Sequence, residues 1–227
     1  MKGLTVNIIV VLCSAASERT LAMNINSQSI RNQEIVELVL LPEYDKVQVV
    51  LLYETLCPAC RQFDTSDFKL LIQELDLYVD IHTYPYGNAH EKVINNETVT
   101  VCQHGPTECY GNMLHGCALN LLSNTTKAQL FNSCTMESQY ADASFDDAAY
   151  QCGSKMYIAA DKIMECAKSD QAKLILSAYG KKSRKYTYDY VPFVVINGKE
   201  WTNHDQDLIK VVCAEFKNPP PICQQYL

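Results

Sequence analysis

Apolar residues form three short runs of strand length along the chain. Residues 47–53 are apolar at nearly every position, which is typical of a central strand buried on both faces. Apolar and polar residues alternate over 77–81, which predicts a second strand, and the run 193–196 predicts a third. An Asn-Gly pair at 197–198 is a strong hairpin signal and makes residues 200–202 the expected partner strand.

In much of the remaining chain, apolar residues recur at the spacing of a helix. This spacing predicts helices over about 58–75, 156–167 and 208–216, and another that ends near Gly180. The stretch from about 85 to 150 lacks strong strand runs, so we expect a helical insertion there. A strand–helix–strand start implies a parallel pair with a right-handed crossover. The predicted fold class is α/β, a thioredoxin-like mixed sheet flanked by helices, with a disulfide-tied helical insertion.

Composition narrows the class of protein. The chain has 227 residues, of which 48% are apolar, and this is enough to build a full hydrophobic core. A formal net charge of −7 argues against nucleic acid as a partner. The eleven cysteines are therefore not explained by a need for disulfides to stabilise a chain that is too small to form a core.

The N-terminus has the layout of a secretory signal peptide over residues 1–16. A basic start, Met1-Lys2, precedes a mostly apolar stretch at 4–12 and small residues suited to cleavage. The apolar stretch is short for a bilayer span, so we expect no membrane anchor; an N-terminal anchor or a buried strand is the alternative. We expect a weakly patterned lead-in over 17–45 and the folded domain over 46–227.

Other features suit the same compartment. Removal of Cys13 with the signal peptide leaves ten cysteines, and an oxidising compartment favours their pairing. Asn96 and Asn124 begin glycosylation sequons. The last four residues, 224–227, are not an ER-retention signal. We therefore expect a glycoprotein of the secretory pathway that is sorted to lysosomes or endosomes or is secreted.

The sequence Cys57-Pro58-Ala59-Cys60 follows the first strand and opens the first helix. A helix N-terminus stabilises a thiolate, which is the form that attacks disulfides. We expect Cys57 to be exposed and to act as the nucleophile, and Cys60 to resolve the mixed disulfide. Pro58 suits the first helical turn.

The motif has two other interpretations, a zinc site and a structural disulfide. Half of a zinc site would need a second CxxC or a pair of histidines at ligand spacing, but six residues separate Cys102 from Cys109. The second alternative is an ordinary structural disulfide between Cys57 and Cys60. The position of the motif between a strand and a helix argues against it. We predict no metal and no cofactor. Val191-Pro192 precedes the third strand, where thioredoxin-like folds place a cis-proline that faces the CxxC and pairs with substrate backbone.

Residues 102–117 read C-Q-H-G-P-T-E-C-Y-G-N-M-L-H-G-C. This segment resembles the signature of the gamma-interferon-inducible lysosomal thiol reductase (GILT) family, C-Q-H-G-x-x-E-C-x-x-N-x-x-x-x-C, without a gap. Four further segments also resemble the family: 53–57, 85–89, 163–166 and 190–192. The resemblance extends from about Val47 to Cys223.

The resemblance implies a thioredoxin-like glycoprotein that reduces protein disulfides at acidic pH in endosomes and lysosomes, with Cys57 and Cys60 as the redox pair. It also implies disulfide-containing protein substrates and a small-thiol reductant. His104 and Glu108 are expected to tie the insertion together, with a catalytic role as the alternative, and Glu54 is a candidate proton carrier for Cys60. Eight cysteines can form up to four structural disulfides, with the pairing open: Cys102, Cys109, Cys117, Cys134, Cys152, Cys166, Cys213 and Cys223.

Two alternatives to a reductase remain at this point. One is an oxidase or isomerase of the ER type on the same fold. The other is a secreted, disulfide-stapled binding protein whose CxxC is vestigial.

Overall fold

A computed structural model describes residues 45–139, 143–202 and 206–227. The predicted signal peptide with Cys13 lies outside these ranges, as does the lead-in apart from Asp45. Within the described ranges, none of the helices combines the length and apolar character that a membrane span requires.

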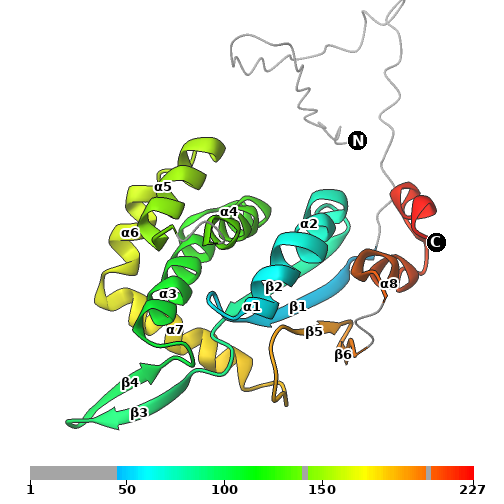
Figure 1. The fold of residues 1–227 in the computed structure, drawn as a ribbon. Coiled ribbons are helices and arrows are strands. Elements are labelled where there is room, and N and C mark those ends of the chain that lie inside the picture. The colour runs from blue at the N-terminus through cyan, green and yellow to red at the C-terminus, as the bar shows by residue number, and fades with distance from the viewer. Residues whose placement is uncertain (1–44, 140–142, 203–205) are drawn as a thin grey trace, which may run out of the picture. The chain divides into compact units, whose positions relative to one another are not determined.

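The centre of the fold is a four-stranded mixed sheet with the order β2-β1-β5-β6 (Figure 1). β1 (Val47–Tyr53) pairs in parallel with β2 (Val79–Pro85), as the strand–helix–strand pattern predicts. β5 (Phe193–Ile196) runs antiparallel to β1 and turns through Asn197 and Gly198 into β6 (Lys199–Glu200). Both faces of β1 are buried beyond the exposed Gln48, because Val49, Leu51 and Tyr53 pack into one hydrophobic cluster and Val50 and Leu52 pack into another.

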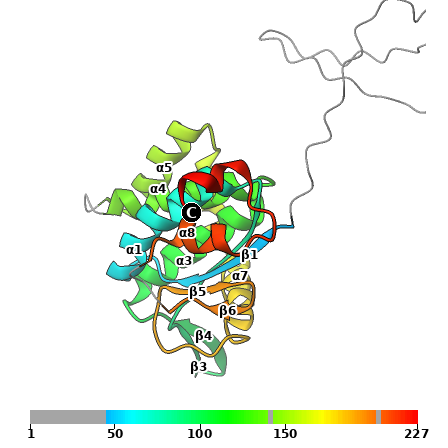
Figure 2. The same ribbon diagram turned by 90° about the vertical axis from the view of Figure 1, so that its right-hand side faces the viewer.

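The predicted helix over 58–75 forms with a change of geometry in the middle. α1 (Pro58–Phe63) passes through a π-helical turn (Asp64–Phe68) into α2 (Lys69–Leu75). These helices and α8 (Leu208–Ala214) share one core with β1, and Figure 2 shows α8 beside the strands β1 and β5. The chain closes with a short 3-10 turn (Pro221–Gln225).

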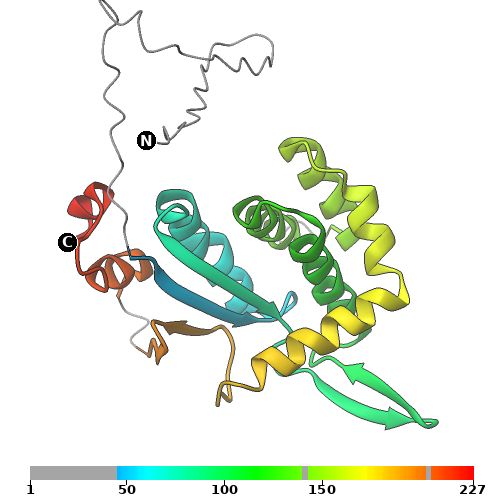
Figure 3. The same ribbon diagram turned by 180° about the vertical axis from the view of Figure 1, so that it is seen from behind.

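The region after β2 corrects the expectation of a purely helical insertion. A hairpin forms first, from β3 (His90–Ile94) and β4 (Glu97–Val101), and it projects from the body of the protein (Figure 3). Nearly all of its residues are exposed. The hairpin therefore has no fully buried residue. β4 alternates threonine and valine over 98–101, but this run is short and β3 shows no alternation, so the strand signal is weak.

Five helices follow the hairpin and lie together away from the β6 edge of the sheet (Figures 1 and 3). Their bounds are α3 (Pro106–Leu121), α4 (Thr125–Ser138), α5 (Phe145–Met156), α6 (Ala160–Ala167) and α7 (Asp170–Ser183). The predicted disulfide-tied helical region is thus present.

Two helix boundaries differ from those predicted. The helix expected over 156–167 is interrupted, because Tyr157 adopts a left-handed conformation with φ 54° and ends α5. Gly180 does not end its helix, which continues to Ser183. A Cβ atom at Gly180 would lie 2.6 Å from ring atoms of Tyr86, so this glycine allows close packing and is not a stop signal.

Asp64 in the π-helical turn is a buried carboxylic acid, and burial raises its pKa from 3.8 to about 7. Between these values the folded chain keeps a proton that the unfolded chain has released, so this group's contribution to stability is lost as the pH rises. Asp64→Asn is therefore expected to raise the free energy of unfolding at pH 8 by about 2–4 kcal/mol, with little change near pH 3.5. Urea denaturation with the disulfides intact measures this.

Asp67→Asn is the matched control, since Asp67 lies in the same turn but is only partly buried. It should change stability little at either pH. Loss of stability in Asp64→Asn at both pH values would contradict the expectation and would show that the carboxylate itself is needed there.

Candidate active site

Cys57 lies at the N-terminus of α1, and its side chain caps the helix. Its Sγ accepts a hydrogen bond from the backbone N–H of Cys60 at 3.4 Å. The same thiol lies 3.7 Å from the carbonyl oxygen of Val191, to which it donates. Cys57 and Cys60 are both free thiols, so the structure has the motif in its reduced form.

The expectation that Cys57 is exposed is wrong. Cys57 is 8% exposed, and Cys60 is fully buried. The segment that carries Val191 packs against the sulfur and covers it. A disulfide therefore has to reach Cys57 through the small opening that remains, whereas Cys60 is shielded from direct attack.

The two thiols have opposite acidities. The largest effect on the pKa of Cys57 is a hydrogen bond from the Cys60 side chain, which lowers it. Burial raises this pKa, but hydrogen bonds from the N–H groups of Cys60 and Ala59 and the charge of His104 lower it further. The net result is a Cys57 pKa of about 6. Burial is the main cause that raises the pKa of Cys60 well above its usual range, followed by its bond to Cys57. The site thus favours a Cys57 thiolate beside a neutral Cys60 thiol.

The Val191–Pro192 peptide bond is cis, as predicted. It precedes β5, and the carbonyl of Val191 is directed at Cys57. This segment and the CxxC come from opposite parts of the chain, and the fold of the sheet brings them together.

The segment 102–117 docks against the residues that lead into the CxxC. Asn112 on α3 accepts hydrogen bonds with Oδ1 from the backbone N–H of Thr55 at 3.0 Å and from the Thr55 hydroxyl at 2.9 Å. All of these groups are buried. Sequence reasoning did not identify Thr55 or assign a function to Asn112, although the fixed position of Asn112 in the signature was a signal.

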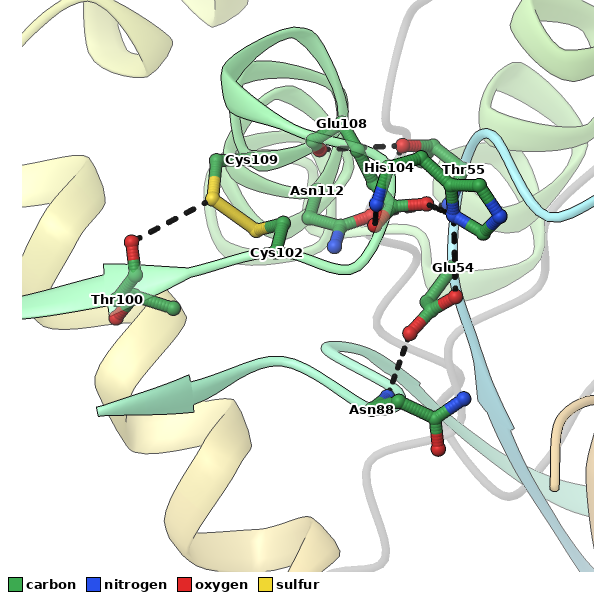
Figure 4. The surroundings of a disulfide bond; sticks show 9 residues. All are labelled: Glu54, Thr55, Asn88, Thr100, Cys102, His104, Glu108, Cys109 and Asn112. Carbon is green, nitrogen blue, oxygen red and sulfur yellow. Dashed lines mark hydrogen bonds and ion pairs between the residues drawn. A yellow bond between two sulfur atoms is a disulfide. The ribbon is translucent and has the colours of Figure 1, made fainter. Parts of the chain in front are cut away.

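His104 and Glu108 tie this segment together and also reach Glu54 (Figure 4). His104 donates its backbone N–H to Glu108 Oε1 at 3.0 Å, and its Nδ1 lies 2.6 Å from Glu108 Oε2. The same Nδ1 lies 3.5 Å from Oε2 of Glu54. His104 Nδ1 thus hydrogen-bonds Glu108 and lies within ion-pair distance of Glu54, so the two buried carboxylates meet at one imidazole nitrogen.

Gly87 makes room for the buried Glu54 side chain. Its φ of +54° is left-handed, and a Cβ atom there would lie 2.7 Å from the carboxyl carbon of Glu54. The next residue, Asn88, donates its backbone N–H to Glu54 Oε1 at 2.6 Å. The turn after β2 therefore fixes the carboxylate three residues before Cys57.

The eight other described cysteines are paired in four disulfides. The pairs are Cys102–Cys109, Cys117–Cys166, Cys134–Cys152 and Cys213–Cys223. The first of them closes the loop that carries His104 and Glu108, and it is drawn in Figure 4. The sequence left 105 pairings open.

Both sequon asparagines are exposed. Asn96 is in the turn of the β3–β4 hairpin, and Asn124 caps α4 by accepting the backbone N–H of Lys127 at 2.8 Å.

Comparison with known proteins gives a family. The sequence model described as "Gamma interferon inducible lysosomal thiol reductase (GILT)" matches residues 48–156. The chain is similar to the gamma-interferon-inducible lysosomal thiol reductase of Carassius auratus, with 34% identity over 77% of this chain and 70% of that protein. It is 32% identical to the gamma-interferon-responsive lysosomal thiol protein of Arabidopsis thaliana, over 78% of this chain and 76% of that protein.

Among solved structures, the reduced form of a disulfide bond oxidoreductase (DsbG) from Mycobacterium tuberculosis has a similar fold. The TM-score is 0.55, with 15% identity over 79% of this chain and 83% of that chain. The fold prediction of a thioredoxin-like mixed sheet with helices is thereby confirmed. Family and fold together make the protein a thiol–disulfide oxidoreductase with protein-disulfide reductase activity. The chain belongs to the gamma-interferon-inducible lysosomal thiol reductase family.

Proposed function

We propose that this protein reduces disulfides of protein substrates in an acidic compartment, with Cys57 as the nucleophile and Cys60 as the resolving cysteine. The observation that carries the proposal is the contrast between the two thiols. Cys57 caps the helix and has a pKa lowered to about 6, while Cys60 is buried with a raised pKa. At pH 5 roughly one Cys57 in ten is ionised, against about one in ten thousand for a thiol with a pKa of 9.0.

The reaction balances as a two-electron transfer. The Cys57 thiolate attacks one substrate sulfur, the substrate S–S bond breaks, and the other sulfur leaves as a thiolate that takes a proton from water. Cys60 then attacks the Cys57 sulfur, and its proton leaves with the second substrate thiolate. The enzyme ends with a Cys57–Cys60 disulfide and the substrate with two thiols, and a small-molecule thiol reductant restores the pair.

The Val191–Pro192 segment supports an extended polypeptide substrate. Its position against Cys57 places backbone groups beside the attacking sulfur. We infer that Val191 pairs with substrate backbone and that Pro192 shapes this contact, which suits disulfide-containing proteins better than small disulfides alone.

Features outside the site support the proposed compartment. Glycosylation of Asn96 and Asn124 requires passage through the secretory pathway, and both side chains are exposed. The names of the curated relatives describe lysosomal proteins. We propose a lysosomal or endosomal location, with secretion as the other destination.

The test of this function is a reductase assay on the purified, glycosylated protein. Loss of interchain disulfides in a denatured, disulfide-linked protein substrate is followed at pH 5 with a small thiol in the assay. We expect turnover well above that of the thiol alone. No increase over the thiol at any pH between 4 and 8 would contradict the proposal.

One observation favours an oxidase as a second candidate. A lowered pKa of the attacking cysteine stabilises the reduced form, and stabilisation of that form makes a disulfide more oxidising. Equilibration of the Cys57–Cys60 pair with glutathione buffers measures its potential. A potential near that of thioredoxin, about −270 mV, supports the reductase, and one near −120 mV supports the oxidase.

A further inference from the structure

Two buried carboxylates share one histidine beside the CxxC. Glu54 and Glu108 are both fully buried, and the Nδ1 atom of His104 lies 2.6 Å from Glu108 and 3.5 Å from Glu54 (Figure 4). The His104 side chain is 33% exposed, so this cluster contacts solvent through the imidazole. One Nδ1–H proton can serve only one carboxylate at a time, and the shorter contact is to Glu108.

A charged Glu54 is therefore poorly compensated. Burial and then the charge of Glu108 raise its pKa to about 7, against the opposing effects of the Asn88 N–H and of His104. Below that pH the Glu54 carboxyl keeps its proton. The charge of the cluster thus changes near neutral pH, above the pH of the acidic compartment proposed for the enzyme.

The groups around Glu54 come from four parts of the fold. His104 contacts it from the loop before α3, and Glu108 on α3 acts on it through its charge; Cys57, which caps α1, and Cys60 within α1 also interact with it electrostatically. Tyr188 approaches from the segment before β5, where its hydroxyl donates to the Gly87 carbonyl at 2.7 Å. Among these groups the Cys57 thiolate is the charge that the reaction needs.

We propose that Glu54, His104 and Glu108 form a proton-holding cluster that sets the upper pH limit of the reductase. A protonated Glu54 leaves the Cys57 thiolate beside a neutral group. An ionised Glu54 places a second negative charge near that thiolate and near the thiolate that leaves the substrate, and it slows the reaction. His104 and Glu108 act through Glu54 and are positioning residues. The inference rests on the proposed roles of Cys57 and Cys60.

The expected signature is a profile of kcat/KM against pH that rises as Cys57 ionises and falls as Glu54 ionises. In Glu54→Gln, the amide oxygen still accepts the Asn88 N–H, but the group carries no charge. The falling limb is expected to disappear, so that the variant is roughly tenfold more active than the wild type at pH 8.

The two neighbours are expected to move the falling limb in opposite directions. Glu108→Gln removes the largest charge that raises the pKa of Glu54, so the limb shifts to lower pH. His104→Gln removes the positive charge that lowers this pKa, so the limb shifts to higher pH. His82→Gln, at a partly exposed histidine on β2, is the control and should leave the profile unchanged.

A second readout does not require turnover. The rate of Cys57 alkylation by iodoacetamide against pH reports the thiolate. Because Glu54 is neutral where Cys57 ionises, Glu54→Gln should leave the midpoint near pH 6 in place and remove the change in rate that accompanies Glu54 ionisation near pH 7. If the wild type shows no reductase activity, the proposed function fails while the alkylation still tests the cluster. The inference would be overturned if the falling limb of the pH profile were unchanged in Glu54→Gln. It would also be overturned if Glu108→Gln and His104→Gln shifted that limb in the same direction. A purely structural role would lower activity evenly at every pH.

Discussion

Replacing Cys57 with serine is expected to reduce disulfide reductase activity to the uncatalysed background. A serine hydroxyl is not ionised at pH 5, and the only other free thiol among the described residues, Cys60, is fully buried with a raised pKa. Cys60 therefore cannot take over the attack. The assay at pH 5 described above measures this, with wild type and variant at equal concentrations of folded protein.

Cys60→Ser is the matched partner of that experiment, because it leaves the attacking sulfur in place. The first step proceeds, and the mixed disulfide between Cys57 and the substrate should accumulate, since the resolving thiol is missing. Non-reducing electrophoresis and mass spectrometry detect the adduct. Comparable turnover in Cys57→Ser, or an adduct on Cys60 in that variant, would refute the assignment of the nucleophile.

The central part of the fold was predictable because its signals are local. A run buried on both faces, a CxxC at a helix start and an Asn-Gly turn each depend on a few adjacent residues, and β1, α1 and the β5–β6 hairpin form where these signals lie. The hairpin β3–β4 was missed for the converse reason. Its strands are exposed and pair only with each other among the described strands, and the alternation of apolar and polar residues is confined to the short run 98–101 in β4.

The chemistry of the site divides in the same way. The cysteines of the CxxC could be located from spacing, but the burial of Cys57 could not, because the segment that covers it lies 134 residues away in the sequence. The contact of His104 with Glu54 likewise joins the signature to the end of β1. Such contacts depend on tertiary packing, which spacing within one segment does not encode.

The signature 102–117 shows how the two kinds of information combine. From the sequence it was a family resemblance with structural cysteines. In the structure, its Asn112 fixes Thr55, its Glu108 and His104 reach Glu54, and its Cys117 connects to Cys166 on α6. The segment thus anchors the residues between β1 and the CxxC.

Removing the Cys117–Cys166 disulfide is expected to cause the largest loss of stability among the four. The bond joins α3 to α6 across 49 residues, and the chain-entropy relation for a loop of that length gives about 4 kcal/mol. Both sulfurs must be removed together in Cys117→Ala/Cys166→Ala, so that no unpaired thiol competes with the CxxC. Guanidinium denaturation without reductant, on protein with Cys57 and Cys60 oxidised, measures the free energy of unfolding.

The double variant Cys213→Ala/Cys223→Ala is the control, since that bond closes a separation of only 10 residues and is expected to contribute about 3 kcal/mol. The Cys117 bond should also matter more for catalysis near the melting temperature, because α3 carries Asn112 and Glu108, which position the residues before Cys57. Well below its melting temperature, where Cys117→Ala/Cys166→Ala is folded, its activity per molecule should stay close to that of the wild type. A larger loss of stability in the Cys213 variant than in the Cys117 variant would show that local packing, and not loop length, determines what these bonds contribute.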